Sequence, residues 1–285
     1  MNILISGSTG LTGSRLMREL QEAGHNPVSI TRADFSRSTE ALAAKLSGAD
    51  VVIHLAGAPI VARWSETYKR EIVASRRDTT RKLVEAMRFA KQAPGYFIST
   101  SAVGIYPDGV VLDEGDDRFA EGFLADVCRS WEEEALAAAA VTKVAVFRLG
   151  VVLAREGGAL PKMLPAFRFG LGGPLAGGKQ GFSWIHIHDL MQAYHFAIKR
   201  QPEGIFNLTA PDVTDNAGYT RVLSSVLNRP AFFPVPAFVL KLAFGEGATA
   251  LTAGQKAVPA RLLKEGFVFK FPRLEEALKD LLKER

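Results

Sequence analysis

The chain has 285 residues, of which 47% are hydrophobic and 23% are charged. This composition is that of an ordinary globular protein and excludes disordered and fibrous classes. The net charge is +5, and the single cysteine, Cys128, excludes an intramolecular disulfide and a zinc cage built from cysteines. We expect a cytoplasmic protein, since one unpaired cysteine fits a reducing compartment.

A short apolar segment, residues 3–5, opens the chain and predicts a buried strand. We expect no signal peptide, because this segment runs straight into glycines without a basic region or a long apolar region. Gly7, Gly10 and Gly13 follow at GxxGxxG spacing, and a helical pattern covers residues 11–23. A strand, a glycine turn and a helix in this order predict a dinucleotide phosphate-binding turn.

Each glycine of this turn has its own physical reason. Gly7 allows a tight turn, Gly10 lets a pyrophosphate approach the backbone, and Gly13 lets the helix pack close to the strand. The helix N-terminus then offers free N–H groups and a partial positive charge to the phosphates. The cofactor-binding residues predicted here are Gly7, Thr9, Gly10, Leu11 and Gly13.

The second expected strand, residues 28–30, ends at Thr31 and Arg32, about 20 residues past the glycines. An NAD-binding protein usually has an acidic residue here for the ribose hydroxyls, whereas an NADP-binding protein has an arginine for the extra phosphate. Arg32 can make a bidentate contact with phosphate, and Thr31 adds a hydroxyl. The sequence therefore favours NADP(H). NAD is the alternative, because Asp34, two residues after Arg32, could bind the ribose of NAD.

Strand and helix patterns continue to alternate along the chain. Further strands are expected at residues 51–55, 96–98, 144–149 and 205–208, and further helices at 41–46, 71–87, 123–140 and 189–199. The strands are apolar on consecutive residues, as in a sheet that is buried on both faces. This alternation predicts an α/β fold with a doubly wound parallel sheet of the Rossmann type.

Basic residues concentrate between Arg63 and Lys91, a stretch that includes the helix expected at residues 71–87. A nucleic-acid face is one explanation of this charge. Ile72 and Met87 belong to an apolar pattern at helical spacing. The other explanation is therefore an amphipathic helix whose basic side faces solvent. We expect no nucleic-acid partner, because no aromatic-rich recognition motif accompanies the charge.

The sequence changes character after Leu153. Glycines crowd into residues 155–183, which predicts a loop-rich insertion on the substrate side of the fold. The apolar stretch 230–244 is broken by three prolines and by Lys241, so it is too short for a membrane helix and we expect no membrane partner.

The last part of the chain reads as helices joined by proline-bent connections and ends in an amphipathic helix at residues 274–282. We therefore divide the chain into an NADP(H)-binding Rossmann domain, residues 1–210, and a smaller, mostly helical lobe on the substrate side, residues 211–285.

Several segments carry a family resemblance. The strand ends at Leu55-Ala56-Gly57 and at residues 99–102 resemble the extended short-chain dehydrogenases/reductases, which include sugar-nucleotide epimerases and dehydratases. A closer resemblance, to the atypical "epimerase family" subgroup that is sometimes labelled cell-division-inhibitor-like, covers essentially the whole chain. It is carried by SAVGIY (101–106), RSWE (129–132), GGAL (157–160), SWIHIHDL (183–190) and GFVFKFP (266–272). The resemblance implies NAD(P) binding at Leu55, Ala56 and Gly57.

The resemblance also implies a proton-transfer set of a serine, a tyrosine and a lysine four residues after the tyrosine. Ser101 matches the serine, but the other two positions, counted back from Glu132, hold Leu124 and Cys128. Neither residue can act as a tyrosinate or a permanent cation. Tyr106, just past the strand that carries Ser101, is the best substitute donor, with packing at a loop edge as the alternative. We predict Ser101 and Tyr106 as catalytic residues.

The remaining polar candidates follow the later strands. Arg148 ends an apolar strand, where it forms either a structural ion pair or a substrate clamp. The resemblance places Trp184 and His186 on the substrate-side wall, and we expect Asp189 to cap the helix that follows. His186 and His188 would share one face of a strand, but no further ligands are evident, so no metal is expected.

Three functions are compatible with these features. The first is an NADP(H)-dependent oxidoreductase acting on an unknown small molecule. Loss of the tyrosine and lysine favours a second, a regulator that binds NADP(H) without catalysis. The third, nucleotide-sugar epimerisation, would need the missing proton shuttle for both hydride steps. His54 and Cys128 are interpreted as core residues, and the sequence specifies neither the substrate nor the oligomeric state.

Overall fold

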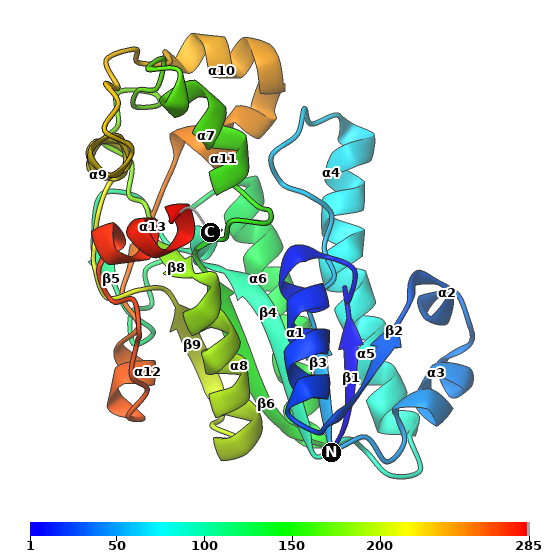
Figure 1. Ribbon diagram of the computed structural model, residues 1–285. Helices are drawn as coiled ribbons and strands as arrows, with labels where there is room; N and C mark the ends of the chain where they lie inside the picture. The colour runs from blue at the N-terminus through cyan, green and yellow to red at the C-terminus, as the bar shows by residue number, and fades with distance from the viewer. Residues whose placement is uncertain (284–285) are drawn as a thin grey trace.

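Six parallel strands form the central sheet of the computed structural model, which describes residues 1–283 (Figure 1). They are β1 (Asn2–Ser6), β2 (Asn26–Ile30), β3 (Val51–His54), β4 (Tyr96–Ala102), β6 (Lys143–Leu149) and β9 (Gly204–Leu208). Their order across the sheet is β2-β1-β3-β4-β6-β9. The predicted α/β fold with a doubly wound parallel sheet is confirmed.

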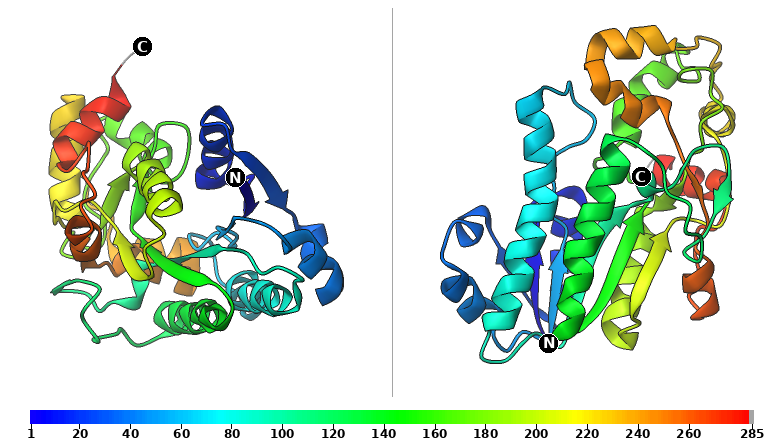
Figure 2. Two further views of the ribbon diagram at one scale, coloured as in Figure 1. Left: turned by 90° about the horizontal axis from the view of Figure 1, so that it is seen from below. Right: turned by 180° about the vertical axis from the view of Figure 1, so that it is seen from behind.

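Helices cover both faces of this sheet. Successive strand residues point to opposite faces, and because they are apolar on both, each face has to be buried against helices. Ile3 and Ile5 of β1 belong to the core under α1 and α8, whereas Leu4 belongs to the core under α3 and α5. Seen from behind, α5 and α6 lie side by side across the second face (Figure 2). The bounds of these helices are α1 (Leu11–Glu22), α8 (Ile187–Arg200), α3 (Thr39–Leu46), α5 (Thr79–Phe89) and α6 (Phe123–Leu136).

The sheet reverses its direction of winding at β1, which lies between β2 and β3. Ser6, the last residue of β1, pairs in register with Ile30 on one side and His54 on the other. The loops that follow these three residues therefore leave the sheet together at one edge. Doubly wound sheets bind ligands in the crevice at such a switch point.

The helix expected at residues 71–87 is interrupted in the structure. It consists of α4 (Glu66–Val73), a π-helical turn (Ala74–Asp78) and then α5. A π-helical turn inserts one extra residue into the helical repeat, which hydrophobic periodicity alone does not reveal, and such turns are frequent at functional sites. A second expected helix, residues 123–140, ends as a 3₁₀ turn over Ala137–Ala140.

The rest of the chain forms small strand pairs and helices, most of which lie beyond the carboxyl ends of the sheet, while the short helix Ala260–Lys264 packs beside the edge strand β9 (Figure 1). The pairs are β7 (Val151–Leu153) with β8 (Trp184–His186) and β5 (Val111–Leu112) with β10 (Lys256–Ala257). The helices are α2 (Arg32–Phe35), α7 (Leu160–Arg168), α9 (Asn216–Leu227), α10 (Ala237–Phe244), α11 (Thr249–Thr252), α12 (Ala260–Lys264) and α13 (Leu274–Leu282). The helix expected at residues 274–282 is confirmed, while the division of the chain at residue 210 stays a prediction.

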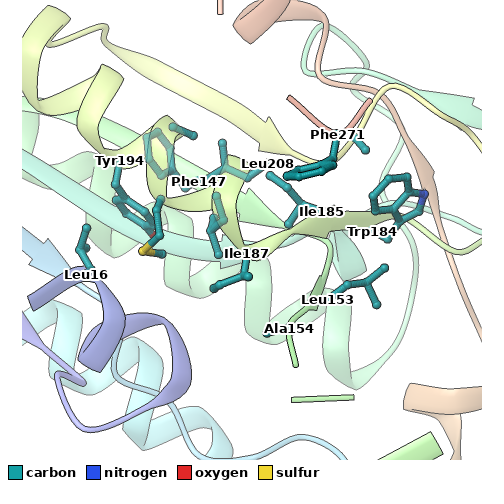
Figure 3. Close-up of a cluster of buried hydrophobic side chains, with 14 of the residues drawn as sticks. Leu16, Phe147, Leu153, Ala154, Trp184, Ile185, Ile187, Tyr194, Leu208 and Phe271 are labelled. Atoms are coloured by element: carbon teal, nitrogen blue, oxygen red, sulfur yellow. The ribbon is translucent and has the colours of Figure 1, made fainter. Parts of the chain in front are cut away.

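One hydrophobic core joins the sheet to this later part of the chain. Phe147 of β6 and Leu208 of β9 belong to the same buried cluster as Trp184 of β8 and Phe271 (Figure 3). Within residues 1–283, no helix combines the length and the apolar character needed to span a membrane.

The expected role of Asp189 is wrong. The N-cap of α8 is His186, whose Nδ1 accepts the His188 N–H at 3.0 Å. The Asp189 carboxylate instead accepts the N–H groups of Lys270 and Phe271, both at 2.9 Å. Asp189 therefore fixes the segment before α13 to α8, a contact between residues about 80 positions apart that local sequence rules cannot foresee.

Candidate functional site

A cavity of about 710 Å³ opens at the carboxyl ends of β1, β2 and β3. Four segments line it: the glycine turn after β1, the end of β2 with α2, the loop after β3, and one side of α4, the π-helical turn and the start of α5. The lining residues are Gly7, Ser8, Thr9, Gly10, Ile30, Thr31, Arg32, Phe35, Leu55, Ala56, Gly57, Ala58, Glu71, Ala74, Ser75 and Thr79.

The glycine turn has the geometry that its spacing predicted. Gly7 has a φ of +71°, and a Cβ there would lie 2.8 Å from the backbone nitrogen of Ala56. A Cβ on Gly13 would lie 2.2 Å from the carbonyl oxygen of Gly7, so α1 can approach β1 only with glycine here. A Cβ on Gly10 meets nothing closer than that same oxygen, at 3.4 Å.

The first turn of α1 borders the cavity at Gly10. This N-cap residue makes no side-chain cap, so the N–H groups at the start of α1 are free for an anion. Gly7, Thr9 and Gly10 line the cavity, whereas Gly13 and Leu11 do not. The Leu11 side chain instead packs under the glycine-rich loop, where Gly157 and Gly158 pass over it.

The two charged residues after β2 have different surroundings. Asp34 is buried, and its Oδ2 accepts hydrogen bonds from the backbone and hydroxyl of Thr31 and from Nζ of Lys45 at 2.7 Å. Although burial alone would raise it, these partners hold the pKa of Asp34 at about 2. Arg32 is exposed and lines the cavity together with Thr31. The free charge at this edge is therefore positive.

Leu55, Ala56 and Gly57 also line the cavity, directly after β3. Eight further lining residues are outside the predicted set: Ser8, Ile30, Phe35, Ala58, Glu71, Ala74, Ser75 and Thr79. Phe35 lies one helical turn after Arg32, a spacing that could have revealed it. The residues of α4 and the π-helical turn could not be found in this way, because the π turn changes which side of the helix faces the sheet.

Ser101 and Tyr106 both belong to one buried network deeper in the fold. The Ser101 hydroxyl donates to Oε1 of Glu132 at 2.7 Å. Glu132 in turn accepts from Nε of Arg148 at 2.9 Å and from its Nη2 at 2.7 Å. Arg148 Nη1 donates to the Tyr106 hydroxyl at 2.7 Å. The two predicted catalytic residues are thus joined through an ion pair, and Arg148 is the structural partner of Glu132.

The hydrogen atoms of both hydroxyl groups are used within this network. The Tyr106 hydroxyl points its own hydrogen toward the Asp113 carbonyl and Oδ1 of Asn207, at 3.0 and 3.1 Å. Burial raises the pKa of Tyr106, and its side chain is only 1% exposed. In this arrangement neither Ser101 nor Tyr106 offers a free donor to a substrate oxygen, and neither lines the cavity. Their catalytic role stays a prediction.

The two residues assigned to the substrate-side wall are enclosed. Trp184 is fully buried in the core, and its Nε1 has no hydrogen-bond partner in the described chain (Figure 3). His186 is 3% exposed, and burial lowers its pKa to about 4. It borders a separate hollow between α1 and α13, not the cavity at the glycine turn. Contact of Trp184 with a ligand would require the core to rearrange, so this assignment also stays a prediction.

His54 and Cys128 are core residues, as their sequence patterns indicated. His54 is fully buried, with the Ser6 hydroxyl at Nδ1 and the Thr79 hydroxyl at Nε2. Burial lowers the pKa of His54 to about 3, so the ring is neutral. Burial raises the pKa of the Cys128 thiol to about 12, which leaves it inert as a nucleophile.

Residues 3–209, which include the whole central sheet apart from one terminal residue, match the NAD dependent epimerase/dehydratase family. The chain belongs to this family. The resemblance found in the sequence is therefore confirmed. Residues 235–281 match a second family model, described only as a domain of unknown function (DUF1731).

Relatives within the epimerase family are similar over nearly the full chain. The epimerase family protein SDR39U1 of Mus musculus is 37% identical, over 99% of this chain and 100% of the mouse protein. A chloroplastic SDR39U1 homolog of Arabidopsis thaliana is also 37% identical, over 99% of this chain and 87% of its own length. The crystal structure of human SDR39U1 (isoform 2) with NADPH has a TM-score of 0.90, 34% identity and 99% coverage of both chains.

Proposed function

We propose that this chain binds NADP(H) and acts as an oxidoreductase-type protein on a small molecule. The observation that carries the proposal is the contrast between Arg32 and Asp34. Asp34, the residue that could have bound an NAD ribose, is held by Thr31 and Lys45. Arg32 remains exposed at the cavity edge, where a guanidinium can bind the 2′-phosphate that distinguishes NADP from NAD.

The residues present fit a dinucleotide. The free N–H groups at the start of α1 and the open space above Gly10 suit a diphosphate, and Arg32 with Thr31 suits the 2′-phosphate. NADP(H), when bound, supplies hydride chemistry at its nicotinamide ring. The human relative that was solved with NADPH supports the same cofactor for this chain.

The proposal includes Ser101 and Tyr106 as the residues that handle the substrate oxygen. Their hydroxyl hydrogens are held by Glu132, Asp113 and Asn207, so substrate binding would have to replace at least one of these hydrogen bonds. The same closed network supports a second candidate function, an NADP(H)-binding regulator without catalysis. Nothing in the geometry favours nucleotide-sugar epimerisation over either of these.

Titration of the wild-type chain with NADPH and NADH tests the cofactor proposal. NADPH is expected to bind more tightly, and equal affinities for the two cofactors would overturn the proposal. Native mass spectrometry of the purified protein then separates the two candidate functions. A small molecule that travels with NADP(H) supports an enzyme, whereas the dinucleotide alone, with no oxidation of NADPH by any carbonyl compound tried, supports a regulator.

We propose the cytoplasm as the location of the protein. The support is the buried, unpaired thiol of Cys128, which fits a reducing compartment. Cell fractionation followed by immunoblotting tests this placement, and recovery of the protein in an organelle or an exported fraction would contradict it.

A further inference from the structure

The helix α10 is apolar around nearly its whole circumference and yet lies in solvent. Seven of its eight residues are apolar, with Lys241 as the exception, and only Leu240 is buried. Phe238 and Leu242, which are one helical turn apart, have exposed fractions of 71% and 77%. A helix that is apolar on all sides is normally buried in a protein core or in lipid. The exposed surface of α10 is therefore a candidate docking surface.

Further exposed apolar side chains lie beside α10, because the loop after α7 runs alongside the segment that leads into α10. The Phe233 N–H donates to the Gly172 carbonyl at 3.1 Å. The Val235 N–H donates to the Pro174 carbonyl at 2.9 Å. Both segments lie at the end of the molecule that is remote from the N-terminus (Figure 1). We call their large exposed apolar side chains the apolar tip: Phe169, Leu171, Phe232, Phe233, Phe238 and Leu242.

The segments that carry the apolar tip contain cations and no acidic residue. Residues 157–180 and residues 222–245 have no Asp or Glu. Glu246, the first acidic residue after α10, forms an ion pair with Lys69. Nη1 of Arg63 donates to the Leu242 carbonyl at 2.9 Å, so a further cation borders the tip. The exposed cations of the two segments are Lys162, Arg168, Lys179, Arg229 and Lys241.

The charge and shape of this surface distinguish between three possible occupants. A second copy of the chain would bring two cationic surfaces together, which opposes self-association. A groove on a protein partner covers one face of a helix, whereas α10 exposes apolar side chains on most sides. The headgroup and acyl boundary of a membrane surrounds an inserted side chain, and anionic headgroups attract nearby Lys and Arg. The residue types therefore fit an anionic lipid surface best.

We propose that the apolar tip docks this protein on the surface of an anionic membrane. The Phe and Leu side chains enter the headgroup and acyl boundary, while the surrounding cations contact lipid phosphates. Residues 230–244 are too short an apolar stretch to span a membrane, as the sequence indicated, but docking on the surface requires no spanning helix. The expectation of no membrane partner is replaced by this proposal.

Vesicle flotation with the wild-type protein tests the proposal. One set of vesicles contains phosphatidylcholine alone, and the other is about one-third phosphatidylglycerol, which supplies anionic headgroups. The protein is expected to bind the anionic vesicles at least roughly 10-fold more tightly than the neutral ones. High salt should reduce this difference, because it screens the attraction. No binding to either kind of vesicle, or equal binding to both at low salt, would overturn the proposal.

Variants of exposed residues test whether the apolar tip makes the contact. Phe238→Ser is expected to weaken binding to anionic vesicles by roughly 10-fold or more. Phe89→Ser is the matched control, because Phe89 is 68% exposed on α5, outside the tip, and this variant should bind like the wild type. Lys241→Gln should weaken binding to anionic vesicles by roughly 5-fold and leave binding to neutral ones unchanged. Circular dichroism checks that each variant is folded, and equal losses in the two Phe variants would contradict the proposal.

Two further measurements identify the occupant of the tip. On binding anionic vesicles, the fluorescence of Phe238→Trp should shift to shorter wavelength and be quenched by lipids with brominated acyl chains. Unchanged fluorescence in the bound protein would show that another surface contacts the lipid and would overturn the proposal. Light scattering of the wild type is expected to show no dimer that depends on the tip. A concentration-dependent dimer that Phe238→Ser abolishes would assign the tip to a second copy of the chain instead.

Discussion

Arg148 and Glu132 form a two-point ion pair beneath the carboxyl ends of β4 and β6, with N–O distances of 2.9 and 2.7 Å. Both side chains are almost completely buried. Although burial opposes it, the Glu132 carboxylate raises the pKa of Arg148 above its usual value. The pair also holds Ser101 and Tyr106, so the integrity of the predicted catalytic region depends on it.

Removal of one partner of this pair should be strongly destabilising. Glu132→Ala leaves the Arg148 guanidinium buried without a counter-ion, and we expect a loss of about 3–5 kcal/mol in the free energy of unfolding. The double variant Glu132→Met, Arg148→Met should recover most of this loss, because no charge is stranded. Urea unfolding measures both. A double variant as unstable as the single one would show that lost packing, not the stranded charge, is responsible.

Arg32→Ala tests the basis of cofactor choice. The variant should weaken NADPH binding by an amount typical of one charged hydrogen-bonded contact, about 1.5–3 kcal/mol, and should leave NADH binding nearly unchanged. The difference in affinity between NADPH and NADH is therefore expected to be smaller in the variant than in the wild type. Fluorescence titration with both cofactors provides the measurement, and Arg200→Ala serves as a control because Arg200 is exposed and does not line the cavity. A preference that survives in Arg32→Ala would remove this residue from 2′-phosphate recognition.

Two glycines of the phosphate turn should behave differently on substitution. Gly10→Val should abolish dinucleotide binding and leave the chain folded, because a side chain at Gly10 projects toward the cavity and meets only one backbone oxygen, at 3.4 Å. Gly13→Val should prevent native folding, since even a Cβ would lie 2.2 Å from the Gly7 carbonyl oxygen. Circular dichroism and NADPH titration distinguish the two outcomes. Native binding by a folded Gly10→Val variant would mean that the turn is only structural.

Tyr106→Phe separates a catalytic hydroxyl from a structural one. The variant removes the acceptor of Arg148 Nη1 and the donor to Asn207, so we expect a stability loss of about 1–3 kcal/mol and unchanged NADPH affinity. If the hydroxyl transfers the proton, turnover of a substrate should fall by about 10²–10⁴-fold. Steady-state kinetics, corrected for the folded fraction, provide the test. Nearly full activity would leave Ser101, water or the substrate as the proton source.

His54 should make stability depend on pH. Its pKa is lowered from 6.5 to about 3, so below pH 6.5 the unfolded chain takes up a proton that the folded chain does not. The contribution of His54 to the free energy of unfolding is therefore fully present above pH 6.5. It falls by about 1.4 kcal/mol per pH unit as the pH decreases toward 4, and His186, whose pKa is also lowered, makes the decrease steeper. Asp34 contributes only below pH 3.8. Urea midpoints at pH 7, 6 and 5 should show this slope, and His54→Gln should reduce it; an equal slope in both proteins would exclude His54.

Much of the fold and part of the candidate site could be predicted from local sequence patterns. Apolar segments alternating with helical patterns predicted the parallel sheet, because strand and helix periodicities are properties of neighbouring residues. The spacing of Gly7, Gly10 and Gly13 predicted the phosphate turn for the same reason, and Arg32 followed from its distance along the chain. These features depend on residues within one βαβ unit.

Contacts between distant residues were decided only by the tertiary structure. Lys45, which is eleven residues from Asp34 in the sequence, forms an ion pair with the Asp34 carboxylate. Arg32 is therefore left as the unpaired charge at the cavity edge. Glu132 reaches Ser101 and Arg148 only because α6 packs against β4 and β6. No sequence spacing determines such contacts, since they depend on which helix covers which strand.

Arg76 shows most clearly the difference between what the sequence predicted and what the tertiary structure decided. The sequence presented it as one of many basic residues on an amphipathic helix, and periodicity placed it on the solvated side. The π-helical turn changes the register of that helix and packs the guanidinium on Gly57 and Ala58. The chain by itself determined the sheet and its glycine turn, because these follow from local backbone geometry. Packing in three dimensions decided which charges are neutralised and which remain free beside the cavity.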